Sequence, residues 1–268
     1  MLTVLDKAAA ILRRDLLTAR RSRGGIIFKV TAIVAEVAAL YYLSHAVGPH
    51  YSADGMPYYA FLLTGTGLFG FLTVTTSGFV DSVRDAQLNG TMEVLMSLNT
   101  SSTLIVALGA GSIFAGRIIN LVVFIAAGLL LFPAGPTLHA NVPAMLLIVF
   151  LSILVTLGIA MLLSALQVLT QRGAAVAWLV TAITSVISGV LYPVSALPGF
   201  LQRLALIHPF THALIGFRLA VVQDASWPQL MQHLLVLGIY AIVLVSAGFL
   251  ALNASLRSAR KLGILSLY

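Results

Sequence analysis

The feature that most limits the possible folds of this chain is a series of long apolar stretches separated by short polar segments. A helix needs about 20 apolar residues to cross the hydrocarbon core of a bilayer, whereas barrel strands are about 10 residues long and alternate in polarity. The stretches cover residues 27–47, 57–79, part of 104–133, 143–168, 174–192 and 231–254. We therefore expect an all-α membrane protein with six transmembrane helices.

The composition supports a surface that faces lipid. Of the 268 residues, 60% are hydrophobic and only 9% are charged, whereas a soluble domain usually has about 25% charged residues. The chain contains no cysteine, which excludes disulfides, thiol catalysis and cysteine metal sites.

The positive charges predict the orientation of the helices. Seven of the 15 Lys and Arg residues lie within the first 29 positions, and three more, Arg257, Arg260 and Lys261, lie near the end. The loops 48–56 and 134–142 contain no Lys or Arg, whereas the loops near 80–101 and 170–173 contain Arg84 and Arg172. Because cytoplasmic loops are enriched in Lys and Arg, both termini are expected inside. The net charge of +7 is then explained without nucleic acid as a partner.

The N-terminal segment, residues 1–25, has the pattern of an amphipathic helix. Apolar positions from Val4 to Ala19 fall near one face, and Lys7, Arg14 and Arg21 fall near the other. This pattern predicts a helix that lies at the cytoplasmic interface. A solvated basic tail that only fixes the topology is the alternative.

A polar segment, residues 80–102, follows the second apolar stretch. Asn89–Gly90 is a helix stop signal, Thr91 is a candidate cap for a short following helix, and Glu93 lies in its first turn. On the cytoplasmic side such a helix docks a soluble partner, if one exists. An ordinary loop between two spans is the equal alternative.

The segment 193–218 is too polar for an ordinary span and too apolar for a solvated loop. We expect Pro193 to end the fifth helix, and Pro198 and Pro209 to lie in the first turns of two short helices. Backbone at membrane depth must be helical or covered by protein. These constraints predict a re-entrant external helical hairpin between spans five and six, with Arg203 and Arg218 near the lipid headgroups.

Two ionisable residues fall inside apolar stretches. Glu36 and Arg117 are costly in hydrocarbon and are expected to face a cavity or a partner. Glu36 either lines a polar pathway or makes a structural hydrogen bond, and Arg117 either reaches the cytoplasmic interface or pairs with Glu36. Gly65, Gly67 and Gly70 predict close helix packing. The histidines and the eight acidic residues form no recognisable metal site or catalytic set.

Three segments resemble a known family. The start "LRRDLLTARRSRGG", the polar segment "RDAQLNGTMEVLMSL" and the late segment "LYPVSALPGFLQRLALIHPFTHALIGFR" are similar to stretches of the permease subunits of ABC-2 type ABC transporters. In that family these stretches form an interfacial connecting helix, a coupling region and a signature before the last span. The resemblance covers nearly the whole chain as one transmembrane domain.

The resemblance implies a prokaryotic multi-pass cell-membrane protein. It would be the permease subunit of an ATP-driven exporter, paired with a second permease copy as a homo- or heterodimer. ATP and Mg²⁺ would bind to a separate ABC ATP-binding subunit, so this chain would be no enzyme, hold no cofactor and lie in membrane lipid. Coupling is expected at Arg84, Asp85, Gly90, Thr91, Glu93 and Leu95. An external gate is expected at Tyr192, Pro193, Pro198, Pro209, Thr211 and Arg218.

Two other classes remain open. A stand-alone secondary transporter would need an intramembrane ion relay and usually has inverted repeats, but the spans hold one carboxylate, Glu36, and show no internal repeat. A non-transport assembly factor would explain the spans but not the polar segment. The transported substrate is not encoded in any recognisable motif.

Overall fold

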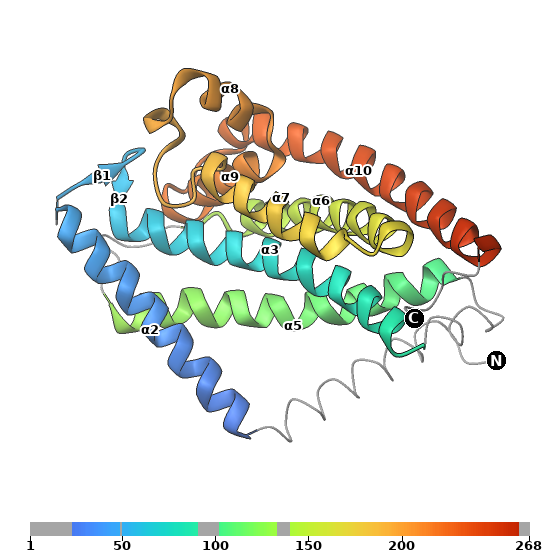
Figure 1. Cartoon of the computed structure of the whole chain (residues 1–268). Coiled ribbons are helices and arrows are strands. Elements are labelled where there is room, and N and C mark those ends of the chain that lie inside the picture. Colours follow the sequence, from blue (N-terminus) through green and yellow to red (C-terminus); the bar gives the residue numbers. More distant parts are fainter. Residues whose placement is uncertain (1–22, 49, 91–101, 133–139, 263–268) are drawn as a thin grey trace.

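The computed structural model describes residues 23–48, 50–90, 102–132 and 140–262. The expected N-terminal interfacial helix lies almost entirely outside these ranges, as do Thr91, Glu93 and Leu95 of the expected coupling region. Nearly all the described chain is helical, as the apolar stretches predict, and the helices lie side by side in a bundle (Figure 1). The helices are α2 (Arg23–Val47), α3 (Tyr58–Leu88), α5 (Ser102–Leu131), α6 (Val142–Thr170), α7 (Gly173–Ile187), α8 (Gly199–Ile207), α9 (Pro209–Val222) and α10 (Trp227–Leu262).

Several helix ends have visible local causes. Asn141 caps α6 by accepting a hydrogen bond from the backbone N–H of Ala144, which satisfies one of the free donors of the first turn. α3 continues nine residues beyond the predicted span 57–79 and stops where Gly90 takes a positive φ of 65°. Glycine adopts this conformation without steric cost, so the Asn89–Gly90 stop signal is confirmed.

The end of α7 differs from the prediction. The fifth apolar stretch was expected to remain helical to residue 192 and to end at Pro193. The helix ends instead at Ile187, and Gly189 turns the chain with a φ of 70°. Pro193 lies farther on, directly before a short 3₁₀ helix, η1 (Val194–Ala196). The turn-forming glycine therefore ends the helix before the proline is reached.

A small β-hairpin was also missed. Strands β1 (Ser52–Ala53) and β2 (Met56–Pro57) pair antiparallel, joined by Asp54 and Gly55, both with positive φ. Asp-Gly is a strong signal for this kind of two-residue turn. The hairpin and η1 lie at one end of the bundle, and the last residues of α3 and α10 lie at the other (Figure 1). These are called the hairpin end and the α10 end below.

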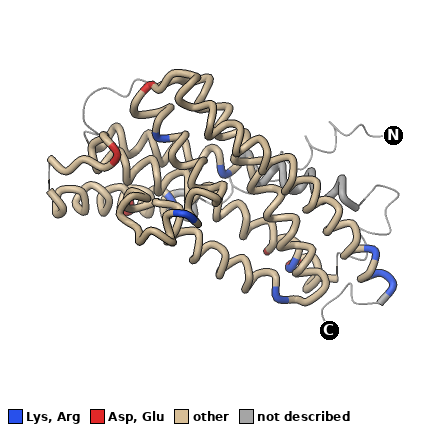
Figure 2. The backbone as a smooth tube through the Cα atoms, turned by 90° about the horizontal axis from the view of Figure 1, so that it is seen from above, with Lys and Arg blue, Asp and Glu red and all other residues tan. Residues whose placement is uncertain are grey.

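Charges are sparse between the two ends, and most of the backbone carries none (Figure 2). Within the described residues, the helical segments Ile27–Val47, Tyr58–Leu88, Val142–Thr170 and Trp227–Lys261 are long and apolar enough to cross a membrane. α8 and α9, which bend by 83° at their junction, add a fifth candidate if counted as one span. Gly116–Leu131 and Gly173–Ile187 are apolar but shorter. The chain is thus an all-α multi-pass membrane protein.

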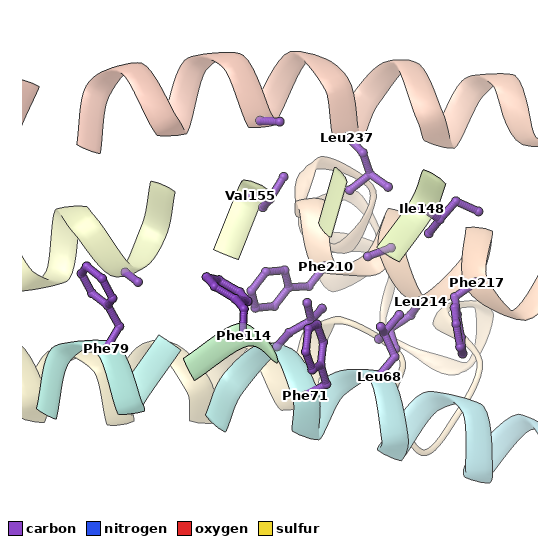
Figure 3. Packing of buried hydrophobic residues seen from close by; sticks show 14 of the residues in the cluster. Leu68, Phe71, Phe79, Phe114, Ile148, Val155, Phe210, Leu214, Phe217 and Leu237 are labelled. Carbon is purple, nitrogen blue, oxygen red and sulfur yellow. The ribbon is translucent and has the colours of Figure 1, made fainter. Parts of the chain in front are cut away.

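The main hydrophobic core lies between α3, α6, α9 and α10, with α5 contributing Phe114 (Figure 3). Aromatic and branched side chains from these helices interdigitate there. α6 and α10 approach closely where Gly158 faces Leu244, because a Cβ on Gly158 would lie 2.5 Å from the Leu244 carbonyl carbon. Small residues allow such backbone contact in membrane proteins. This core fixes α9 inside the bundle.

Candidate functional site

Arg218 is the central polar residue of the hairpin end. It lies on α9, is only 3% exposed, and donates hydrogen bonds to the carbonyls of Gly189, Val190 and Phe61 at 2.8–3.2 Å. Its guanidinium also lies 3.5 Å from the centroid of the Phe61 ring, a favourable cation–π distance. Both Nη atoms of Arg218 are therefore partnered by carbonyls inside the protein, while its Nε has no hydrogen-bond partner among the described residues. Its expected position near the lipid headgroups stays a prediction.

The sequence makes room for this arginine with a glycine on α3. A Cβ on Gly65 would collide with Nη2 of Arg218 and lie 2.6 Å from the Val190 carbonyl oxygen. Gly65 thus permits close packing, as predicted, but its partner is a buried cation and a loop carbonyl. The side chain joins α9 to α3 and to the loop after α7.

The other expected gate residues surround this loop. Tyr192 donates its hydroxyl to the carbonyl of Val186, Pro193 precedes η1, and Pro198 lies immediately before α8 instead of inside it. Pro209 is the first residue of α9, as predicted, and Thr211 is fully buried one turn into the core. The structure therefore brings the six residues to one region, but only Arg218 makes long-range side-chain hydrogen bonds there.

The bend between α8 and α9 is held by residues that the sequence did not single out for this role. His208 caps α9 by accepting from the N–H of Phe210, and its Nε2 lies 3.3 Å from Oγ1 of Thr184 on α7. Tyr240 of α10 donates to the carbonyl of Ile207 at 2.6 Å. Arg203 of α8 is exposed. The bend is therefore joined to both α7 and α10.

Further hydrogen bonds tie the loops of the hairpin end together. Tyr58 donates to the carbonyl of Leu191, Gln223 to that of Asp54, and Asn141 to that of Ala225. A cavity of about 280 Å³ lies among these loops. Asp54, Ser195 and Arg218 are its polar lining residues. This end is thus a cap held by polar side chains that reach across the sequence.

The α10 end contains the described part of the expected coupling region. Arg84 and Asp85 are exposed in the last turns of α3, and Gly90 follows the helix end. One turn away the side chain of Gln87 is buried and accepts from Nε2 of Gln167 on α6 at 3.3 Å. Oε1 of Gln167 in turn accepts from the N–H of Ala174 on α7. This buried pair, which the sequence analysis missed, joins three helices beside the exposed charges.

Glu36 lies midway along α2, on a cavity of about 280 Å³ between α2, α3 and α5. Its polar lining residues are Lys29, Glu36, Thr66, Arg117 and Asn120. The structure brings Glu36 and Arg117 to the same cavity, but no ion pair or hydrogen bond joins them in the described chain. The cavity is called the α2–α3–α5 cavity below.

No cluster of three metal-ligating side chains occurs within the described ranges. His212 and His233 approach to 3.0 Å through their Nδ1 atoms, and Nε2 of His212 donates to the carbonyl of Leu206. These contacts join α9 to α10 through His233 and α9 to α8 through the Leu206 carbonyl. The two histidines therefore help to hold the bend, and the described residues supply no third metal ligand beside them.

The long apolar helices define a multi-pass membrane protein. The comparison with protein families gives the particular identity: a model of the ABC-2 type transporter matches residues 7–222. The chain belongs to this family and is the permease component of an ABC transporter, a class that generally works with an ATP-binding subunit. The search of curated proteins found no match.

Proposed function

We propose that this chain is the membrane-spanning subunit of an ATP-driven exporter in a prokaryotic cell membrane, acting as a dimer with separate ATP-binding subunits. The observation that carries the proposal is the family match over residues 7–222 in a chain without the phosphate-loop pattern G-x-x-x-x-G-K-[ST]. That loop cradles the phosphates of ATP in P-loop enzymes. ATP and Mg²⁺ therefore belong to a partner, and this chain supplies the path and no catalytic step.

The proposed topology has six spans with both termini in the cytoplasm. Arg84, Arg172, Arg257, Arg260 and Lys261 lie at or near helix ends on the α10 side, whereas the hairpin end carries Asp54 with only two arginines, exposed Arg203 and buried Arg218. This distribution supports a cytoplasmic α10 end. α5 and α7 then complete the six spans, and the hairpin end faces outward.

Coupling to the ATPase is proposed at the α10 end, through residues 80–102 together with the N-terminal segment 1–25. The exposed pair Arg84 and Asp85 lies directly beside the buried Gln87–Gln167 contact. A push on the end of α3 would therefore reach α6 and α7 through packed polar groups. Coupling of this kind requires an element with two states. In the proposed complex that element is the pair of ATP-binding subunits, which would close when ATP binds.

At the other end, the segment 193–218 is proposed as an external gate that re-enters the bilayer. Pro209 and the 83° bend between α8 and α9 support a segment that turns back into the bundle. Exposed apolar side chains on α8, such as Phe200 and Leu206, suit partial immersion in lipid. Arg218 anchors this gate from within.

The translocation path is proposed between two permease copies, with Glu36 near it. α2 exposes large apolar side chains, among them Ile27 and Phe28 at 68% and 76% exposed, which a second copy and lipid would cover. The second copy is either identical or a related permease. Glu36 lies on the cavity beside this face.

Co-purification followed by ATP hydrolysis tests the proposal. The chain is expressed with a candidate ABC ATP-binding subunit, and the complex is reconstituted in liposomes. We expect a stable complex whose ATP hydrolysis depends on the permease. Transport by the permease alone in liposomes without ATP would contradict the proposal and favour a secondary transporter.

A cysteine pair tests the orientation, since the chain has no native cysteine. Gly199 at the start of α8 has open space around its Cβ position, and Leu88 at the end of α3 is 54% exposed. Gly199→Cys should react with an impermeant maleimide applied to intact cells. Leu88→Cys should react only after the cells are opened, and the reverse pattern would invert the topology.

A further inference from the structure

We propose that the α2–α3–α5 cavity binds the headgroup of a singly anionic phospholipid, with Lys29 and Arg117 as the ligands of its phosphate. The cavity has a volume of about 280 Å³ and is lined by side chains of three helices. The proposal goes beyond the proposed function, on which it rests only for placing this face in the bilayer.

The first argument is charge. The lining carries two cations, Lys29 and Arg117, and one carboxylate, Glu36, so its net charge is +1. None of the three makes a hydrogen bond or ion pair with another residue in the described part of the chain. Arg117 is half-buried, and Lys29 and Glu36 are exposed at the cavity; charged groups within a membrane protein's apolar region normally find a partner. Arginine and lysine are the side chains that bind phosphate oxygens, so a monoanionic phosphate complements the site.

The second argument is a buried hydroxyl. Oγ1 of Thr66 faces no hydrogen-bond partner among the described residues, although it is shielded from solvent. Every other Ser and Thr of α3 donates to a backbone carbonyl three or four residues earlier, as Thr64 does to Ala60. Buried polar atoms without a partner are rare in native proteins. Thr66 lines the cavity, and rotation about its Cα–Cβ bond would bring this shielded hydroxyl toward a bound phosphate.

The third argument is the apolar remainder of the lining. Phe28, Phe71 and Phe124 contribute rings to the cavity wall, and Phe28 is 76% exposed at its edge. Ile27 beside it is 68% exposed. A free inorganic anion makes no use of these surfaces, whereas the acyl chains of a bound lipid would lie along α2 in place of bulk bilayer lipid. The geometry therefore favours an amphiphile.

Glu36 adds a condition on the headgroup. Its carboxylate repels a second negative charge and attracts a cation. A headgroup with one negative charge and no ammonium should bind more tightly when Glu36 loses its charge. A zwitterionic headgroup should bind less tightly after the same change. The two headgroup types therefore respond to one variant with opposite signs.

Gly70 permits a clean steric test. It lines the cavity, and a Cβ at this position meets no atom within 4 Å. Gly70→Leu should therefore fill the cavity without displacing the backbone. Gly238 on α10 also has no atom within 4 Å of its Cβ position and lies outside the cavity lining. Gly238→Leu is the matched control.

The experiment is native mass spectrometry of the purified complex, titrated without ATP with phosphatidylglycerol or phosphatidylcholine of the same acyl chains. We expect preferential retention of phosphatidylglycerol and a loss of about tenfold in its affinity for Arg117→Gln and for Lys29→Gln, the size expected for one charged hydrogen bond. Gly70→Leu should abolish the preference, Gly238→Leu should keep it, and Glu36→Gln should increase it. Thermal unfolding of each variant confirms that it is folded.

Four results would overturn the proposal. Equal retention of both lipids would show that the cavity has no preference for the anionic headgroup. A preference for phosphatidylglycerol that is unchanged in Arg117→Gln and Gly70→Leu would show that it binds elsewhere. Weaker binding of phosphatidylglycerol to Glu36→Gln would contradict the repulsion expected from the carboxylate and would indicate a site for a cationic or zwitterionic headgroup. Full displacement of phosphatidylglycerol by an equal concentration of inorganic phosphate would indicate a free-anion site. Because no ATP is present, failure here leaves the proposed ATP-driven transport untouched.

Discussion

Two arginines within the bundle, Arg218 and Arg117, show how differently one fold treats the same side chain. Arg218 is 3% exposed and donates to three carbonyls from two segments. Arg117 is half-buried on the α2–α3–α5 cavity and makes no hydrogen bond or ion pair with any described residue. The first arginine belongs to the structure of the hairpin end, and the second has no partner among the described residues.

The difference teaches that burial of a cation has two meanings in a membrane protein. A buried charge is stable only where polar groups of the protein replace water, as the carbonyls do at Arg218. Where such groups are lacking, the charge marks a place for a partner or ligand. Substitutions at the two arginines and at their neighbours should therefore differ in their effect on stability.

The largest effect is expected for Arg218→Leu. The change strands the carbonyls of Gly189, Val190 and Phe61 without donors and removes the cation–π contact, so the free energy of unfolding should fall by about 3–5 kcal/mol. Thermal unfolding of the detergent-purified protein measures it. The control is Arg203→Leu on exposed α8, which should change little. Equal losses of stability in Arg218→Leu and Arg203→Leu would contradict a structural role for Arg218.

Gly65→Ala should have the next largest effect. Its Cβ would collide with Arg218 and crowd the Val190 carbonyl, and overpacking of this kind costs about 1–3 kcal/mol. Gly70→Ala, five residues along the same helix, meets open space and should be neutral or stabilising, since alanine favours a helix over glycine by roughly 1 kcal/mol. The two melting temperatures should therefore move apart, and a shared shift would contradict the packing described for Gly65.

Tyr240→Phe should have a smaller effect at the same end. It removes the hydroxyl that donates to the carbonyl of Ile207 at 2.6 Å, a bond worth about 1 kcal/mol. Tyr42→Phe is the control, because Tyr42 is 67% exposed. Protease cleavage near the α8–α9 bend measures local opening, and it should increase only in Tyr240→Phe. Unchanged cleavage would show that α10 does not hold the bend.

Arg117→Leu should have the smallest effect on stability. No described residue loses a hydrogen bond, so the free energy of unfolding should change by less than about 0.5 kcal/mol. Thermal unfolding without added lipid measures it beside Arg218→Leu. A loss as large as that of Arg218→Leu would give both arginines the same structural role and end the comparison.

The sequence predicted well what depends on local chemistry. Length and hydropathy placed helices over all six apolar stretches, and Asn89–Gly90 and Pro209 marked a helix end and a helix start correctly. The Asp54–Gly55 hairpin carried a recognisable turn signal that was not used. α7 ends before Pro193 because Gly189 adopts a positive φ without steric cost and turns the chain there.

Contacts between residues far apart in the chain could not be predicted from the sequence. The burial of Arg218 was not predicted, because nothing in the sequence shows that Gly65 leaves room for it on α3. The Gln87–Gln167 bond joins residues 80 positions apart, and a glutamine in a polar segment resembles any solvated residue. Placing Glu36 and Arg117 on one cavity required three helices to meet.

ATP hydrolysis by the reconstituted complex tests the central claim most directly, that this permease belongs to an ATP-driven transporter and has no ATP-hydrolysing step of its own. The rate is measured for the partner ATPase alone, for the permease alone, and for both together in liposomes. We predict no hydrolysis by the permease, and a faster rate for the pair that disappears when the phosphate-loop lysine of the partner is replaced. Hydrolysis by the permease alone, or a partner rate unaffected by its presence, would contradict the account.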